Sequence, residues 1–297
     1  MSNYIHYIDF NAIKLGDLAN GLGDYQCASE NYTRALQRLR RYQGDQMQPM
    51  FMAKELTEKI NDLNGRTGTS KRIFYYATWN LTKTSFVKGT QCSKYLYLDK
   101  HKKGEKTPYS AATLNLFNKG RLFEEAVRST EFPNGIDIKE VVGSFAYFNS
   151  YTNYLINLGV SMTLYEATII EDGLMVMCDI LTNDSDGNID IYEIKLNSEI
   201  NDAILNDLAI QYYVCKKRFG SRLRSFNLIL RISDTEWSIT HMNEDLEPKL
   251  GDVQKKISKY HQILSGKEPE IAMGNHCHSP YKCEFVSYCE KIATIQI

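Results

Sequence analysis

The sequence lacks any long apolar run and any excess of charge of one sign. Its longest apolar stretch, residues 173–178, is far shorter than the ~20 residues that cross a bilayer, so we expect no membrane-spanning segment. Lysine and arginine number 35 against 36 aspartates and glutamates, for a net charge of −1. Because no global field attracts a polyanion or a membrane surface, any basic binding surface must be concentrated locally.

We also expect no secretion signal, since the start MSNYIHYIDF has no basic region. The seven cysteines are unevenly placed, and three of them stand six residues apart near the C-terminal end. In an intracellular chain such a group binds metal more often than it forms disulfides, and we expect a cytoplasmic protein. Hydrophobic residues at 43% and charged residues at 24% are typical of globular proteins, which excludes a disordered or fibrous chain.

Apolar periodicity divides the chain into two parts. Residues 1–70 are expected to form a helical extension and a linker, because residues 61–70 are polar and contain two glycines. The segment LANGLGDYQCASENYTRAL resembles one tetratricopeptide helix pair. No second copy follows, so a docked helical extension is the alternative interpretation. Residues 71–297 are expected to form the main domain.

The main domain alternates between helical and strand-like periodicity. Predicted helices cover residues 108–130, 138–158, 202–220 and 250–266. Predicted strands cover residues 161–170, 173–181, 189–196 and 225–233. The order of helix, three-strand meander, helix and strand predicts an α/β fold with a small mixed sheet flanked by helices.

Two carboxylates and a lysine fall on neighbouring predicted strands. The period of two places Glu193 and Lys195 on one face, and Asp179 lies in the preceding strand. Lone charges in such apolar strands are costly to bury without a partner, so the set suits a hard divalent cation with oxygen ligands. Asp207 and Gln211 add a polar pair four residues apart on the next helix. The alternative is a solvated strand face.

This D…ExK pattern, followed by a helix glutamine, resembles the PD-(D/E)xK nuclease superfamily in its RecB-like branch. LFNKGRLFEEAV, FPNGIDI, YEATIIEDGLMVMCDIL and CHSPYKCEFVSYC look like CRISPR-associated RecB-like exonucleases with a cysteine cluster. The resemblance covers roughly residues 80–290. It implies a restriction-endonuclease-like core and an Mg²⁺- or Mn²⁺-dependent deoxyribonuclease that acts on single-stranded ends or flaps of DNA.

The resemblance also implies roles for individual residues. Asp179, Glu193 and the backbone carbonyl of Ile194 would hold the metal, and Lys195 and Gln211 would be catalytic. Accessory positions fall on Glu166 and Tyr212. A further metal ligand falls on Glu124, where the family usually has histidine. Two other departures are Cys215 at the family's tyrosine position and Cys178 at its proline position.

The C-terminal cysteines need a fourth ligand to complete a metal site. The triplet consists of Cys277, Cys283 and Cys289. By resemblance the fourth ligand is Cys92, and four thiolates suit a 4Fe-4S cluster or a Zn²⁺ ion. Spacing alone leaves open a zinc site completed by His276 or His278, as well as unligated thiols. The resemblance favours iron–sulfur, with a structural role.

Local groups of basic residues are candidate contacts for nucleic acid. They include Lys102, Lys103, Lys216 and Lys217, and tyrosines nearby can stack on unpaired bases. Solvated helix ends are the alternative interpretation of these lysines. Two other functions remain open: an inert nucleic-acid-binding or scaffold protein that keeps the nuclease fold, and an adaptor whose N-terminal helices carry the function.

Overall fold

The computed structural model describes residues 4–233 and 235–295 and divides into two compact units. The first unit includes the N-terminal helices up to Ala77, together with Ile136–Gly159 and Leu164–Ala167. The second unit contains the rest of the described chain. Among the described residues, no helix combines the length and apolar character that spanning a membrane requires.

Most of the first unit is helical, and its short segments Ile136–Asp137 and Leu164–Ala167 belong to strands. Its helices are α1 (Phe10–Leu22), α2 (Tyr25–Leu39), α3 (Met47–Leu63), α7 (Ile138–Val142) and α8 (Phe148–Ile156). The prediction of a single helix over residues 138–158 is wrong. Gly143 adopts a left-handed conformation with φ of 67° and ends α7, so the chain turns before α8 begins.

A mixed seven-stranded sheet confirms the predicted α/β class. The strands follow the order β2-β3-β4-β5-β6-β7, and β1 also pairs with β4. Their bounds are β1 (Leu81–Thr82), β2 (Ile136–Asp137), β3 (Met162–Glu171), β4 (Leu174–Asn183), β5 (Ile189–Lys195), β6 (Leu223–Arg231) and β7 (Trp237–His241). The predicted meander is present as β3, β4 and β5, whereas β1, β2 and β7 were not predicted.

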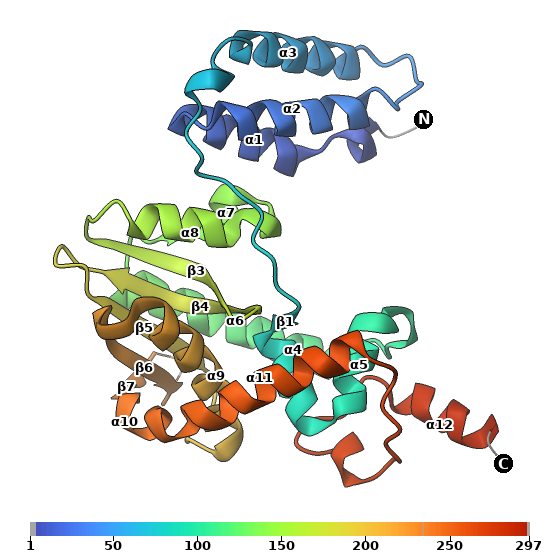
Figure 1. The fold of residues 1–297 in the computed structure, drawn as a ribbon, viewed down its shortest axis with the longest axis vertical. Helices are drawn as coiled ribbons and strands as arrows, with labels where there is room; N and C mark the ends of the chain where they lie inside the picture. The colour runs from blue at the N-terminus through green and yellow to red at the C-terminus, as the bar shows by residue number, and fades with distance from the viewer. Residues whose placement is uncertain (1–3, 234, 296–297) are drawn as a thin grey trace. The chain divides into compact units, whose positions relative to one another are not determined.

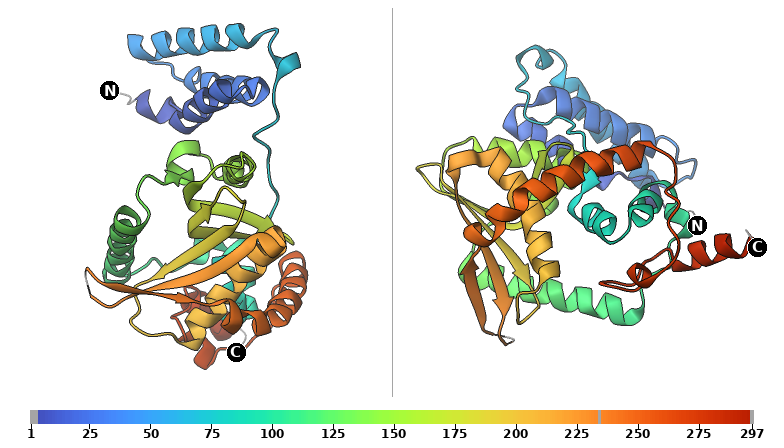
Figure 2. Two further views of the ribbon diagram at one scale, coloured as in Figure 1. Left: turned by 90° about the vertical axis from the view of Figure 1, so that its left-hand side faces the viewer. Right: turned by 60° about the horizontal axis from the view of Figure 1, so that its bottom comes forward.

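Helices cover both faces of the sheet in the second unit (Figures 1 and 2). They are α4 (Lys83–Gln91), α5 (Ser93–His101), α6 (Ala111–Glu131), α9 (Asp202–Phe219), α10 (Asn243–Leu246), α11 (Leu250–Ser265) and α12 (Val286–Ile295). Helices α9 and α11 lie on one face and α6 on the other. The thiols of Cys178 in β4 and Cys215 in α9 lie 3.6 Å apart in the buried layer between them.

In the first unit, hydrogen bonds to the Asp24 carboxylate join the start of α2 to residues 73–74. The carboxylate caps α2 by accepting the Cys27 N–H (3.1 Å), and it also accepts the N–H groups of Ile73 (2.9 Å) and Phe74 (2.8 Å). The side chain is 3% exposed, so its removal would leave buried donors without acceptors.

We predict that Asp24→Ala lowers the free energy of unfolding by about 3 kcal/mol, because a cap and two further hydrogen bonds are lost. Urea denaturation of the full-length protein measures the effect. Asp9→Ala is the matched control, since Asp9 caps α1 through a single hydrogen bond to the Ala12 N–H and should cost about 1 kcal/mol. Equal losses in the two variants would contradict the anchoring role.

Candidate active site and thiol cavity

One edge of β4 is shared by two strands. A strand has two edges, and β3 occupies one of them, so β1 and β5 must share the other. The strand β1 pairs with the first two residues of β4, and β5 pairs with the last four, from Ile180 onward. Asp179 precedes Ile180 and therefore lies across from Glu193, where β1 and β5 diverge. Its Oδ2 atom accepts the Ile194 N–H at 2.7 Å.

Two lysines hold the carboxylate of Glu193, which is 1% exposed. The Nζ atoms of Lys195 and Lys83 lie 2.7 and 2.8 Å from its Oε1 atom. The same ammonium groups lie 2.6 and 3.3 Å from Oδ2 of Asp207 on α9. Burial alone would raise the pKa of Glu193, but the charges of Lys195 and Lys83 outweigh burial and lower the pKa to about 2.

Both lysines stay protonated at neutral pH. Burial works to lower the pKa of Lys195, but Glu193 and Asp207 outweigh it and hold the pKa well above its usual value. The pKa of Lys83 is raised in the same way, because the charge of Glu193 outweighs the effect of burial. Lys195 can therefore donate hydrogen bonds and stabilise negative charge, but it cannot take a proton from water.

For Asp179, in contrast to the lysines, the surroundings favour the neutral form. Burial raises its pKa well above the usual value, and the neighbouring charges of Glu193 and Glu124 raise it further. Glu124 forms an ion pair with Arg128, one turn later on α6, and Arg128 also donates to the backbone carbonyl of Asp179 (3.0 Å). The charges of Lys83 and Lys195 oppose this rise only in part, and a divalent metal ion would provide the remaining compensation.

Unpartnered polar atoms mark the same region. Within the described chain, both amide atoms of Gln211 and the Oε2 atom of Glu193 are buried without a hydrogen-bond partner. No three His, Cys, Asp or Glu side chains of residues 4–233 and 235–295 are arranged, as they stand, to hold a metal ion. The donors themselves, carboxylates with an amide oxygen one turn after Asp207, fit a hard cation.

The structure thus brings Asp179, Glu193, Lys195 and Glu124 together, and it places both predicted accessory residues in other contacts. Glu166 pairs with Lys139 at 2.8 Å in the first unit. Tyr212 donates to Glu247 at 2.7 Å and packs against Phe226.

The predicted nucleic-acid lysines fall into two groups. Lys216 lies 4.0 Å from Glu247, and Lys217 forms an ion pair with Asp172, so acidic neighbours offset both charges. Lys102 and Lys103 are exposed where α5 ends. Exposed charges can meet phosphates directly, whereas Lys216 and Lys217 would first have to break their contacts.

Sequence reasoning missed Lys83 and Arg128. Lys83 directly follows the short strand β1, and Thr82 and Ser85 form a capping box that starts α4 there. That signature predicts the helix start but not the reach of the lysine to Glu193. Arg128 carried a clearer signal, because it stands four residues after Glu124 on one helix face.

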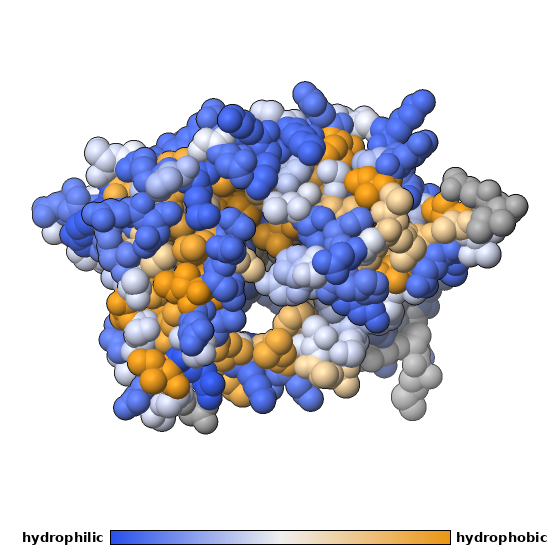
Figure 3. Space-filling model, turned by 90° about the horizontal axis from the view of Figure 1, so that it is seen from below, coloured by the Kyte–Doolittle hydropathy of each residue, from blue (hydrophilic) through white to orange (hydrophobic). Residues whose placement is uncertain are grey.

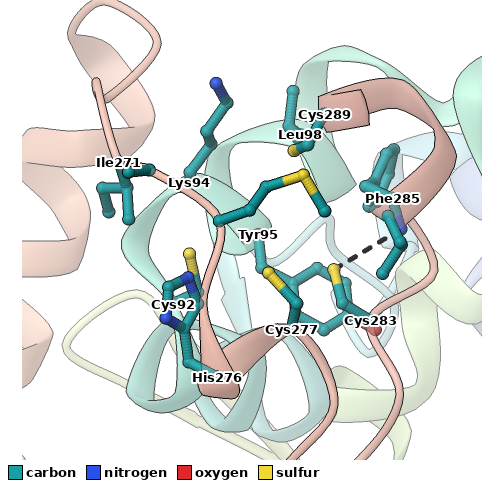
Figure 4. A pocket seen from close by; sticks show the side chains of 13 residues that line it. Cys92, Lys94, Tyr95, Leu98, Ile271, His276, Cys277, Cys283, Phe285 and Cys289 are labelled. Atoms are coloured by element: carbon teal, nitrogen blue, oxygen red, sulfur yellow. Dashed lines mark hydrogen bonds between the residues drawn. The ribbon is translucent and has the colours of Figure 1, made fainter. Parts of the chain in front are cut away.

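The C-terminal cysteine triplet and the distant Cys92 line one small cavity of about 20 Å³ in the second unit (Figure 4). Cys92 lies between α4 and α5, Cys289 lies in α12, and the other two are Cys277 and Cys283. His276 also lines the cavity, whereas His278 is exposed and lies outside the lining. Of the two histidines considered for zinc, only His276 is therefore placed near the thiols.

The thiols repel one another as anions. Burial raises the pKa of Cys283 to about 11, and the charges of Cys289, Cys92 and Cys277 add to the effect. Burial also raises the pKa of Cys289. Four thiols around one cavity, two of them with a raised pKa, are a donor set that fits a thiolate-bound metal centre, whose cation would favour the thiolate form.

An ionic network holds the cysteine-bearing tail against α4 and α5. The Oε2 atom of Glu284 lies 2.7 Å from the Lys88 ammonium and accepts the Tyr95 hydroxyl at 2.8 Å. Lys88 also pairs with Asp99 (2.7 Å), and the Glu284 carbonyl accepts the Thr107 N–H (2.8 Å). These bonds fix the segment between Cys283 and α12 without the help of a metal.

A groove of about 660 Å³ opens beside Lys195 and Asp207. Helices α4, α9 and α11 supply most of its walls, and Tyr281 of the tail, 58% exposed, completes them. The side-chain amide of Gln91 donates to the carbonyls of Tyr281 and His276, both at 2.7 Å, and so ties this wall to α4. Figure 3, which views the molecule from below, shows a hollow near the centre of that face.

The sequence matches no known family description and no curated protein. Function is therefore inferred from the geometry of the carboxylates, lysines and thiols.

We predict that Asp179→Asn stabilises the metal-free protein by about 1 kcal/mol at pH 7, since it removes a buried, repelled carboxylate but keeps an acceptor for the Ile194 N–H. The folded pKa of Asp179 is raised, so the contribution of this group to wild-type stability falls as pH rises above the unfolded pKa of about 3.8. The gap between variant and wild type should widen from pH 4 upward. Thermal unfolding in a chelator measures it, and a destabilised variant would contradict the assignment.

Proposed function

We propose that this chain is a metal-dependent DNA nuclease of the PD-(D/E)xK type, with a restriction-endonuclease-like core of the RecB branch. One observation carries the proposal: Asp179 and Glu193 face each other where β1 and β5 diverge, and Lys195 is held on Glu193. The substrate proposed is DNA with single-stranded ends or flaps.

The carboxylates and the lysine would divide the chemistry between them. Asp179, Glu193 and the Ile194 carbonyl, with Glu124 as a further ligand, would hold Mg²⁺ or Mn²⁺, which when bound polarises a phosphodiester and lowers the pKa of a water. Lys195, which stays protonated, would donate to a phosphate or water oxygen and stabilise the negative charge that develops there. The unpartnered amide of Gln211 is suited to orienting a water at the same position.

The residues that line the groove suit a single-stranded substrate. The groove reaches from Lys195 to the exposed ring of Tyr281, and its floor contains apolar side chains such as Phe86 and Val253. Apolar linings and exposed rings accept unstacked bases, and Lys249 can meet a phosphate, whereas Lys256 would first have to release Asp252, 2.7 Å away.

We predict that Asp179→Asn abolishes Mg²⁺- or Mn²⁺-dependent cleavage of labelled linear DNA, because a metal ligand is lost. Lys195→Ala should reduce cleavage roughly 10²–10³-fold, as expected when one electrostatic donor is removed. Glu124→Gln should cause a smaller loss. Its matched control is Glu125→Gln, because Glu125 is exposed and pairs only with Arg121 on the helix surface.

Equal rates for wild type and Asp179→Asn would refute the nuclease proposal. A wild-type protein that binds DNA but does not cleave it with either metal would instead indicate an inert nucleic-acid-binding protein. Lys83 and Lys195 would then serve to neutralise Glu193 permanently.

We also propose that the four thiols hold a 4Fe-4S cluster that clasps the tail to α4 and α5. Anaerobically purified protein should be brown, with broad absorbance near 400 nm. Cys283→Ala should lose the metal and part of its thermal stability, because ligation is linked to folding. Cys27→Ala, which removes a buried thiol in the first unit, should keep both. Colourless wild-type protein with stoichiometric zinc would overturn the iron–sulfur assignment.

A further inference from the structure

The first unit contains a pocket of about 520 Å³ that the proposed cleavage chemistry does not use. Its walls come from the first turn of α2, from the extended segment 70–76 and from Tyr147. All of these residues belong to the first unit. A pocket of this size accommodates a ligand of nucleotide dimensions.

Hydrogen bonds fix the segment that carries most of the pocket's side chains. The N–H of Lys71 donates to the Gly23 carbonyl (2.9 Å), and the hydroxyl of Ser70 accepts the Gln26 N–H (3.0 Å). Asp24 then holds the backbone of the next residues, as described above. Side chains on this segment are therefore positioned before a ligand arrives, which lowers the entropic cost of binding.

Aromatic rings form one side of the pocket. Phe74 stacks on Tyr151 with ring centres 5.7 Å apart, and Tyr76 lies 4.7 Å from the ring of Tyr147. Tyr76 is nevertheless 65% exposed, so only part of its ring is covered by Tyr147. An open tyrosine face beside a pocket is suited to stacking with a flat ligand such as a nucleobase.

The charges at the rim favour an anion. Among the described residues, Lys71 and Arg72 form no ion pair, unlike Lys216 and Lys217. Of the two carboxylates in the lining, Asp24 is surrounded by N–H donors, which leaves Glu30 against two cations. A guanidinium and an ammonium on one short segment match the phosphate of a nucleotide.

We propose that this pocket binds one unpaired nucleotide, with the base against Tyr76 and the phosphate at Lys71 and Arg72. A nucleotide within a strand and a free mononucleotide present the same base and phosphate, so both are candidate ligands. Binding needs no metal and does not depend on the carboxylate site.

The test uses the full-length protein in EDTA, which prevents metal-dependent cleavage. Fluorescence anisotropy measures binding of a short labelled oligothymidylate, and calorimetry measures binding of thymidine 5′-monophosphate. Tyr76→Ala should weaken binding of the true ligand roughly 5- to 150-fold, the range that corresponds to one lost base–ring stack, whereas Tyr76→Phe should not. Arg72→Ala should weaken binding and, for the strand, reduce the salt slope by about 1.

Matched controls remove an exposed ring or cation of the first unit outside the pocket. Phe51→Ala and Arg40→Ala should leave both affinities unchanged, because neither residue lines the pocket. An effect of Tyr76→Ala on the oligonucleotide alone identifies a strand, and an effect on the mononucleotide identifies the free ligand.

Two results would overturn the proposal: no binding of either ligand by the wild type, or unchanged affinities in both Tyr76→Ala and Arg72→Ala. The nuclease proposal is judged separately, by cleavage with metal in wild type and Asp179→Asn. Binding that depends on Tyr76 in a protein that cleaves nothing would refute the nuclease alone.

Discussion

A buried group of charges fixes the arrangement of the second unit. Four carboxylates meet three cations there: Glu124, Asp179, Glu193 and Asp207 against Lys83, Arg128 and Lys195. These residues come from β4, β5, α4, α6 and α9, so the elements must converge for any of the charges to be compensated. The cations are fewer by one, and Asp179, whose pKa is raised, accepts the Ile194 N–H but forms no ion pair among the described residues. A proton or a divalent cation completes the set.

Short-range patterns explain why much of this site could be predicted. Strand period placed Glu193 and Lys195 on one face, and the structure joins them at 2.7 Å. The turn between β4 and β5 is short, so Asp179 had to return beside Glu193. Helix α9 was also predicted, from its apolar periodicity and from the glycine that ends it.

Long-range contacts explain most of what was missed. Lys83 reaches Glu193 across 110 positions of sequence, and nothing in its local pattern distinguishes it from a surface lysine. The two-residue strands β1 and β2 are too short to show a period. The predicted helix over 138–158 failed for a local reason, since Gly143 was a visible break to which apolar periodicity gave too little weight.

The positions of the remaining cations bear on how this chain could bind a strand. The net charge of −1 and the carboxylates beside Lys216 and Lys217 give the chain no overall excess of positive charge to replace the counterions of a duplex. Both pockets discussed above instead combine two or three cations with an exposed tyrosine, Tyr281 in the second unit and Tyr76 in the first. Stacking is available only to unpaired bases, because paired bases are already stacked within the duplex. Under the proposed function, such surfaces suit a single strand better than a duplex.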